Sequence, residues 1–126
     1  MCAKIFFSYT LRDGEISKDI LLKIKQQFER FSELETYFDL LDNHSTNHQE
    51  YVYSALANAN ILCLIKSPAI NVSIWVRKEL YVAKIRNLPI VEISKKEVVQ
   101  IVNNKTKNEF INHPKIKEIM NSIAWV

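Results

Sequence analysis

Short apolar runs recur along the chain and are separated by longer amphipathic segments. Residues 61–65 (Ile-Leu-Cys-Leu-Ile) are apolar at every position, which is typical of a strand buried on both faces of a parallel sheet. Residues 3–7, 36–40 and 88–93 are similar runs, and Pro89 stands near the start of the last one, where a missing amide is tolerated. The pattern therefore predicts four strands.

The first two segments between these runs have the helical period of apolar residues. A helix is expected from Ile16, with Asp13 as its candidate N-cap. Residues 46–49 (Thr-Asn-His-Gln) have the form of a capping box, in which the hydroxyl of Thr46 reaches forward, so a second helix should begin there. The expected buried stripes are Ile16, Ile20, Leu21, Ile24, Phe28 and Phe31 in the first helix and Val52, Ala55, Leu56 and Ala59 in the second.

The chain turns at Pro68 after the 61–65 run and enters a central helix that should end near Arg86. Ser73 or Asn71 is its expected N-cap. Its buried stripe is expected to be Val76, Leu80 and Ala83.

Strands that alternate with helices at this spacing predict an α/β fold with a parallel sheet covered on both faces. We expect one domain, residues 1–126, with a flavodoxin-like sheet of about five strands in the order 2-1-3-4-5. Residues 97–102 and 114–122 read as shorter helices, and residues 123–126 as a closing strand or a packed anchor.

In this arrangement the crevice opens where strands one and three separate. That rule brings residues 8–13 face to face with residues 67–75, with residues 41–47 alongside. These three loops are the predicted site.

Trp75 and Glu79 lie four residues apart on the central helix, so an indole and a carboxylate project side by side. Such a pair can hold a planar cationic ring and stabilise positive charge on its sugar. The alternative is that Trp75 only packs and Glu79 is solvated.

The formal net charge of +3 is unevenly placed, because residues 94–126 hold six Lys against three Glu. These charges are spread through a helix-like pattern, which favours a solvated face over nucleic-acid binding.

No apolar run has the length of a membrane span, and no signal-peptide pattern precedes the first strand. Two cysteines, Cys2 and Cys63, cannot form a disulfide framework, which fits a cytoplasmic protein.

Three blocks of the sequence, taken in order, resemble a TIR domain. Residues 5–9 (Ile-Phe-Phe-Ser-Tyr) with Arg12-Asp13 resemble the opening strand of the family. Residues 56–67 resemble its middle strand. Ser73, Trp75, Glu79 and Leu80, followed by Pro89-Ile90-Val91, resemble its most specific signature.

This resemblance implies an activity, because some TIR domains cleave NAD between nicotinamide and ribose and some cyclise the remaining ADP-ribose into a signal. Glu79 matches their catalytic Glu, and NAD would be a substrate, with no cofactor and no metal. The residues implied to bind substrate are Ser8, Tyr9, Arg12, Asp42, Ser73 and Trp75. The loop near residues 42–47 would serve self-association and closing of the site.

A single acid is enough for this reaction in principle. The transition state is oxocarbenium-like, so a carboxylate beside the ribose stabilises the developing charge. Nicotinamide leaves as a neutral molecule and needs no general acid. If 126 residues is the full length, no effector is fused to the chain. We then expect a stand-alone bacterial TIR enzyme of the Thoeris antiphage kind, whose cyclic ADP-ribose product activates a separate partner protein.

Other readings remain open. The serious alternative is a non-enzymatic TIR module that assembles with other TIR domains, and a second is an enzyme similar to nucleoside deoxyribosyltransferases. A metal site is suggested by His44, His48 and Asp42. A solvated loop is favoured instead, because no further ligands accompany these three residues. A receiver domain is disfavoured because Lys66 and Ser67 stand where its acceptor Asp is needed, and no glycine-rich phosphate loop follows any strand.

Overall fold

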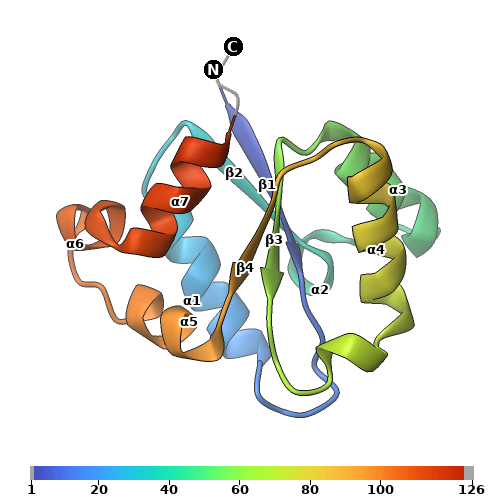
Figure 1. Ribbon diagram of the computed structural model, residues 1–126, viewed down its shortest axis with the longest axis horizontal. Helices are drawn as coiled ribbons and strands as arrows, with labels where there is room; N and C mark the ends of the chain where they lie inside the picture. Colours follow the sequence, from blue (N-terminus) through green and yellow to red (C-terminus); the bar gives the residue numbers. More distant parts are fainter. Residues whose placement is uncertain (1, 124–126) are drawn as a thin grey trace.

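A computed structural model describes residues 2–123, apart from the side chain of Val72. Its four strands are β1 (Ala3–Ser8), β2 (Leu34–Phe38), β3 (Ile61–Ile65) and β4 (Ile90–Ile93). All neighbouring strands pair in parallel, in the order β2-β1-β3-β4, and helices cover both faces of the sheet (Figure 1). The α/β class and the order of the first four strands are confirmed. The fifth strand falls mainly on residues 124–126, outside the described residues, and Ile123 only ends the last helix.

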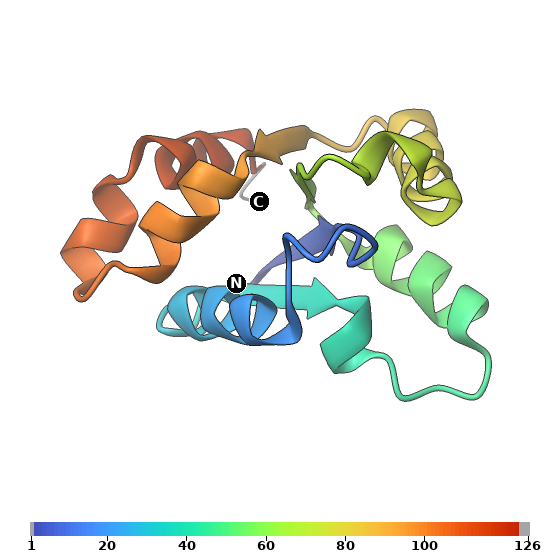
Figure 2. The ribbon, with the colours of Figure 1, turned by 90° about the horizontal axis from the view of Figure 1, so that it is seen from below.

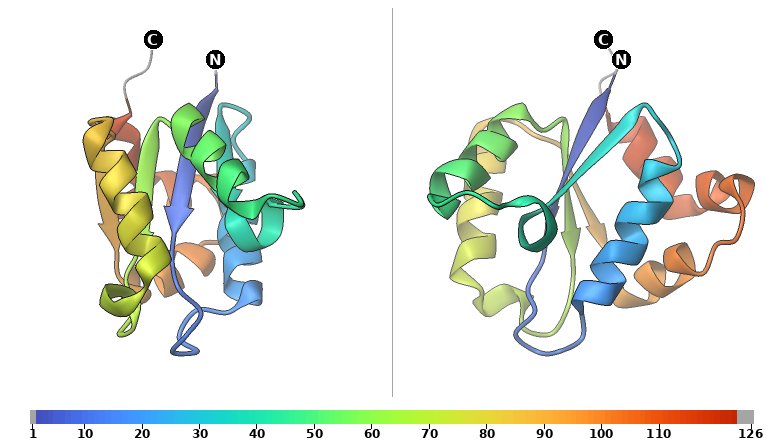
Figure 3. Two further views of the ribbon diagram at one scale, coloured as in Figure 1. Left: turned by 90° about the vertical axis from the view of Figure 1, so that its right-hand side faces the viewer. Right: turned by 180° about the vertical axis from the view of Figure 1, so that it is seen from behind.

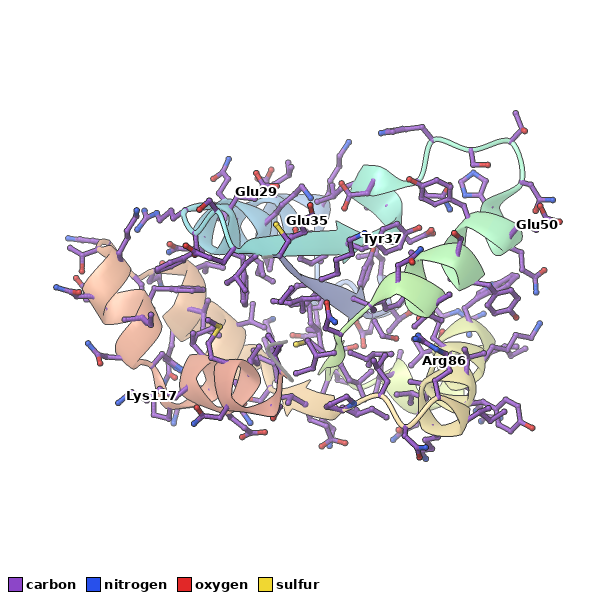
Figure 4. The ribbon with its side chains drawn as sticks, turned by 90° about the horizontal axis from the view of Figure 1, so that it is seen from above. Glu29, Glu35, Tyr37, Glu50, Arg86 and Lys117 are labelled. Carbon is purple, nitrogen blue, oxygen red and sulfur yellow. The ribbon has the colours of Figure 1, made fainter. Side chains whose placement is uncertain are left out.

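The helices form two layers. They are α1 (Lys18–Glu29), α2 (Asp39–Asp42), α3 (His48–Asn58), α4 (Ile74–Ile85), α5 (Lys95–Val102), α6 (Lys107–Asn112) and α7 (Pro114–Ser122), with a 3-10 turn at Ile70–Val72. Helices α1, α5, α6 and α7 lie on one side of the sheet, and α3 and α4 lie on the other (Figure 1). Arg86, just after α4, donates a hydrogen bond to the carbonyl of Leu56 in α3 and ties these two helices together (Figure 4).

Successive side chains of β1 point to opposite faces of the sheet, and this divides the core between the two helix layers. Ile5 and Phe7 pack toward α1, where the Phe7 ring stacks on Phe38 at 4.3 Å and meets the edge of Phe28 at 5.4 Å between centroids. Phe6 points to the opposite side and joins the core beneath α3 and α4. Cys63 is fully buried in β3, as its pattern predicts.

Two predicted helix caps are wrong. Helix α1 begins at Lys18 and is capped by Ser17, because the carboxylate of Asp13 instead accepts a hydrogen bond from the Ala69 amide, at 2.7 Å. Helix α3 is capped by Asn47 rather than Thr46, because the Asn47 side chain accepts from the Glu50 amide at 3.3 Å.

The second strand ends two residues earlier than predicted. It stops at Phe38, and Asp39–Asp42 forms the short helix α2 instead of continuing the strand to Leu40. The carboxylate of Asp42 accepts a hydrogen bond from the Phe38 amide at 2.8 Å, which closes a turn at the strand end. This change of boundary alters which residues face the site.

The central and carboxyl-terminal helices agree better with the sequence pattern. Ser73 is the N-cap of α4 and accepts from the Val76 amide at 3.3 Å. Helix α7 has the predicted bounds, whereas α5 begins two residues before the predicted Glu97, at a capping box made by Ser94 and Glu97. Helix α6 was not predicted, although its Phe110 is buried against Phe28.

Candidate functional site

The candidate site lies at the carboxyl edge of the sheet, where the chain leaves β1 and β3 in opposite directions (Figure 2). The chain after β1 leads to α1 on one face, and the chain after β3 leads to α4 on the other face. The Asp13 carboxylate bridges these two loops through the Ala69 amide, and this hydrogen bond lowers the pKa of Asp13. The predicted meeting of residues 8–13 with residues 67–75 is therefore confirmed.

A cavity of about 340 Å³ lies at this junction. Two of its walls are the loop after β1 and the first turns of α4, and Asp39 of α2 closes a third side. The lining residues are Phe7, Tyr9, Thr10, Leu11, Arg12, Asp39, Ser73, Ile74, Trp75 and Glu79. Five of the seven predicted site residues line this cavity: Tyr9, Arg12, Ser73, Trp75 and Glu79. A sixth, Ser8, contacts Glu79 from the end of β1.

Glu79 is the central carboxylate of the cavity. Its Oε1 accepts a hydrogen bond from the hydroxyl of Ser8 at 2.8 Å, and Ser8 itself is buried at the end of β1. Burial raises the pKa of Glu79 to about 7, although the Ser8 hydrogen bond opposes this and the charge of Asp39 adds to it. The alternative reading, in which Glu79 is simply solvated, is therefore wrong, and its side chain changes charge near neutral pH.

Trp75 keeps most of its surface in solvent, with 61% exposed. The ammonium of Lys78 lies 4.9 Å from its ring centroid, so the indole already holds a cation over one face. Because Trp75 lines the cavity beside Glu79, it does not serve mainly as a core residue. An exposed aromatic wall of this kind suits a flat ligand.

Tyr9 positions helix α2 against the loop after β1. Its hydroxyl oxygen accepts a hydrogen bond from the Leu40 amide at 2.8 Å. Burial raises the pKa of Tyr9 to about 12, and the nearby acids contribute, so the hydroxyl stays neutral. Ser73 lines the cavity while capping α4, and Arg12 contributes a guanidinium from the exposed loop.

Asp42, by contrast, is not brought to the cavity. Its carboxylate pairs with the ammonium of Lys25 at 3.0 Å and accepts from the Phe38 amide at 2.8 Å. The Lys25 ammonium also lies 3.4 Å from the carbonyl of Thr36, so the pair covers the free edge of β2. Asp42 therefore has structural contacts at the end of β2 and is not among the described residues that line this cavity.

Asp39 is a site residue that the sequence reasoning missed. Its Oδ1 accepts hydrogen bonds from the Tyr37 hydroxyl at 3.0 Å and from the Asn43 side-chain amide at 2.7 Å. The signal that could have found it is its place directly after β2, at the carboxyl edge where ligands of such sheets bind. Because the predicted strand extended to Leu40, Asp39 was expected inside the strand rather than directly after it.

A second cavity of about 260 Å³ adjoins the first, and Asp39, Trp75 and Glu79 line both. Its other wall is the amino-terminal part of α3, which lies beside α2 and its following loop (Figure 3). That wall consists of His48, Gln49, Val52 and Tyr53, with Lys78 from α4 opposite. A larger cavity of about 430 Å³ lies between α3 and the β1–β2 edge, and Glu79 is not among its lining residues.

His44 is exposed, and no group of three or more His, Cys, Asp or Glu residues within 2–123 is arranged to hold a metal ion. Across the same residues, none of the helices combines the length and the apolar character needed to span a membrane.

Comparison with known protein families finds no family model that matches this sequence, and comparison with curated proteins finds no matching relative.

Proposed function

We propose that this protein cleaves the bond between nicotinamide and ribose in NAD, with Glu79 as the carboxylate that faces the ribose. The observation that carries this proposal is the partly buried Glu79, held by Ser8 and sharing a cavity with the exposed ring of Trp75. The resemblance of residues 73–80 to the TIR signature points to the same chemistry. The flavodoxin-like sheet of five strands and a cytoplasmic location belong to the same proposal.

The reaction breaks the C1′–N1 bond, and its electron pair passes to the pyridine nitrogen, so nicotinamide leaves neutral. Positive charge then develops on the ribose, where the Glu79 carboxylate stabilises it. Water or a hydroxyl of the ADP-ribose attacks C1′ and loses one proton, which gives a linear or a cyclic product. No second acid is required for departure of nicotinamide.

Glu79 must be ionised for this role. Because burial raises its pKa to about 7, the free protein contains both the protonated and the ionised form near neutral pH. A bound pyridinium places a positive charge beside the carboxylate and lowers its pKa, which favours the ionised form once substrate is present.

The remaining lining residues have roles that fit the same substrate. The exposed face of Trp75 stacks on the flat pyridinium ring. Arg12 offers a guanidinium at the rim, which suits the pyrophosphate. In this proposal a cyclic product activates a separate effector protein in antiphage defence, as the resemblance to Thoeris-type TIR enzymes implies.

Incubation of the purified protein with NAD, followed by chromatography of nicotinamide and the ribose product, tests this proposal. We expect Glu79→Gln to lower the rate about 100-fold or more, since an electrostatic contact to the transition state is removed. Glu29→Gln is the matched control, because Glu29 is an exposed glutamate on α1, across the sheet from the site (Figure 4). Equal rates for all three proteins, or no turnover by wild type even with extract of infected cells, would contradict the proposal.

A second candidate function, assembly with other TIR domains, is favoured by one feature of α4. Ile74, Tyr81 and Ile85 lie on one face of this helix and are 63%, 67% and 63% exposed. In this alternative these three exposed side chains and the loop at residues 43–47 contact other copies, and Glu79 is dispensable. Sedimentation of wild type and Tyr81→Ser at matched concentrations tests it, because the alternative predicts assembly that Tyr81→Ser weakens.

A further inference from the structure

We propose that Asp39 is a second substrate-binding carboxylate of this site, which accepts a hydrogen bond from a hydroxyl of the nicotinamide ribose. This inference rests on the proposed function and assigns a contact to a residue outside the TIR-like motifs named above. The two carboxylates come from different elements, Glu79 from α4 and Asp39 from the start of α2, and both line the two adjoining cavities.

The Asp39 carboxylate is held in place on one side only. The hydroxyl of Tyr37 and the side-chain amide of Asn43 both donate to Oδ1, at 3.0 and 2.7 Å. Among residues 2–123, no donor reaches Oδ2. One oxygen is therefore fixed by the protein while the other keeps its full capacity to accept hydrogen bonds from a ligand.

The two donors are themselves well anchored. The ring of Tyr37 stacks on Phe6 at 5.1 Å between centroids. Asn43 is only 6% exposed, and its side-chain amide also donates to the carbonyl of His48 at 3.1 Å. Asp39 is consequently a preorganised acceptor and needs no rearrangement to bind a ligand.

The contact differs in kind from that of Glu79. Glu79 has its Oε1 bound by Ser8, and the proposed function places it beside the carbon where charge develops. The two residues line the same two cavities, and the charge of Asp39 also helps to raise the pKa of Glu79. A ribose between them offers its C1′ to one acid and a hydroxyl of its vicinal diol to the other.

A purely structural role for Asp39 makes a different prediction. If its only function is to fix Tyr37 and Asn43, its loss loosens α2 and affects every ligand of the cavity equally. If it binds one hydroxyl, its loss affects only ligands that have this hydroxyl. A comparison between substrate analogues therefore separates the two roles.

The test measures dissociation constants by calorimetry in the Glu79→Gln background, where turnover is suppressed. The ligands are NAD and two analogues that lack the 2′- or the 3′-hydroxyl of the nicotinamide ribose. We expect Asp39→Asn to weaken NAD binding about tenfold, the scale of one charge-assisted hydrogen bond, and to leave one of the two analogues within about twofold. Tyr37→Phe, which keeps the carboxylate but removes one donor, should weaken NAD binding about threefold and spare the same analogue.

Equal weakening of all three ligands, or unchanged NAD binding by Asp39→Asn, overturns the assignment of Asp39 while the proposed function stands. If Asp39→Asn does not fold, as judged by circular dichroism, the response of Tyr37→Phe decides in the same way. Absence of NAD binding in the Glu79→Gln protein, together with absence of nicotinamide release by wild type, overturns both proposals at once.

Discussion

The two sides of the sheet differ in how they use their side chains. Of the described residues, 20 buried side chains form the core on the side of α1, α5, α6 and α7, and only eight form the core beneath α3 and α4. The larger core contains interlocking rings of Phe7, Phe28, Phe38 and Phe110. Helices α3 and α4 instead line the cavities around Glu79 and leave apolar side chains in solvent.

This difference indicates that one side of the sheet mainly stabilises the fold and the other side mainly forms the site. The side with α1 supplies most of the apolar burial that stabilises the fold. The side with α4 tolerates a partly buried carboxylate, open cavities and an exposed indole, each of which costs stability. Features of this kind are expected where a site is built, so the comparison itself points to α4.

The largest effect on stability is expected in the aromatic core. Phe28 is fully buried and meets the rings of Phe7 and Phe110 edge-on. Phe28→Ala should lower the free energy of unfolding by about 3–5 kcal/mol, because it removes apolar burial and leaves a cavity. Denaturant unfolding measures this change, and a loss below about 1 kcal/mol would contradict the assigned role of this core.

Glu79→Gln should have the opposite effect on stability at the site. Because the folded-state pKa of Glu79 is raised to about 7 from an ordinary value of 4.5, folding is favoured by its protonated form. This contribution is fully present below about pH 4.5 and is lost as the pH rises through 7. The uncharged Gln avoids that loss, so the variant should be more stable than wild type by up to about 3 kcal/mol at pH 8.

The difference between wild type and Glu79→Gln should vanish at pH 4, where both side chains are uncharged. Thermal unfolding at several pH values measures both ends of this curve. A variant that is less stable at pH 8 would mean that the Ser8 hydrogen bond outweighs the burial of the charge.

Trp75→Ala should weaken NAD binding about tenfold, the scale of one stacked ring. Tyr81→Ala is the matched control, because Tyr81 is an equally exposed aromatic residue on α4 that is not among the described lining residues of the three cavities. Both variants should keep their stability within about 0.5 kcal/mol, since both rings are largely in solvent. Calorimetry in the Glu79→Gln background compares them, and equal losses of affinity would remove Trp75 from the site.

The smallest expected effect tests the place of Asp42. Asp42→Asn should lower stability by about 1 kcal/mol, because it weakens the contact with Lys25 at the edge of β2. It should leave the affinity for NAD unchanged, since Asp42 is not among the described residues lining the two cavities around Glu79. Weaker NAD binding with unchanged stability would restore Asp42 as a substrate contact.

The accuracy of the sequence reasoning followed the strength of the local pattern. Residues 61–65 and the stripe of α4 are unambiguous, and the strand order followed from general rules of chirality and connection. The errors lie where several short polar residues compete for one role. Asp13 and Ser17 both suit an N-cap, and the distant Ala69 amide decides between them.

The same limit explains what was missed at the site. Ser8 and Glu79 could be brought together from topology alone, because Ser8 ends β1 and Glu79 lies on the helix that follows the neighbouring strand β3. Predicting Asp39 as a site residue would have required the true end of β2. The hydrogen bond from the Phe38 amide to the Asp42 carboxylate fixes that end. No periodicity reports a single hydrogen bond of this kind.

The central claim is that ionised Glu79 drives nicotinamide release, and the pH dependence of kcat/KM tests it most directly. For wild type we expect kcat/KM to rise about tenfold per pH unit up to about pH 7 and then to level off, as the free carboxyl group ionises. Glu79→Gln should show a low rate without this rise. A wild-type profile that is flat between pH 5 and pH 8 at constant folded fraction, or a Glu79→Gln protein with the same rising profile, would contradict the claim.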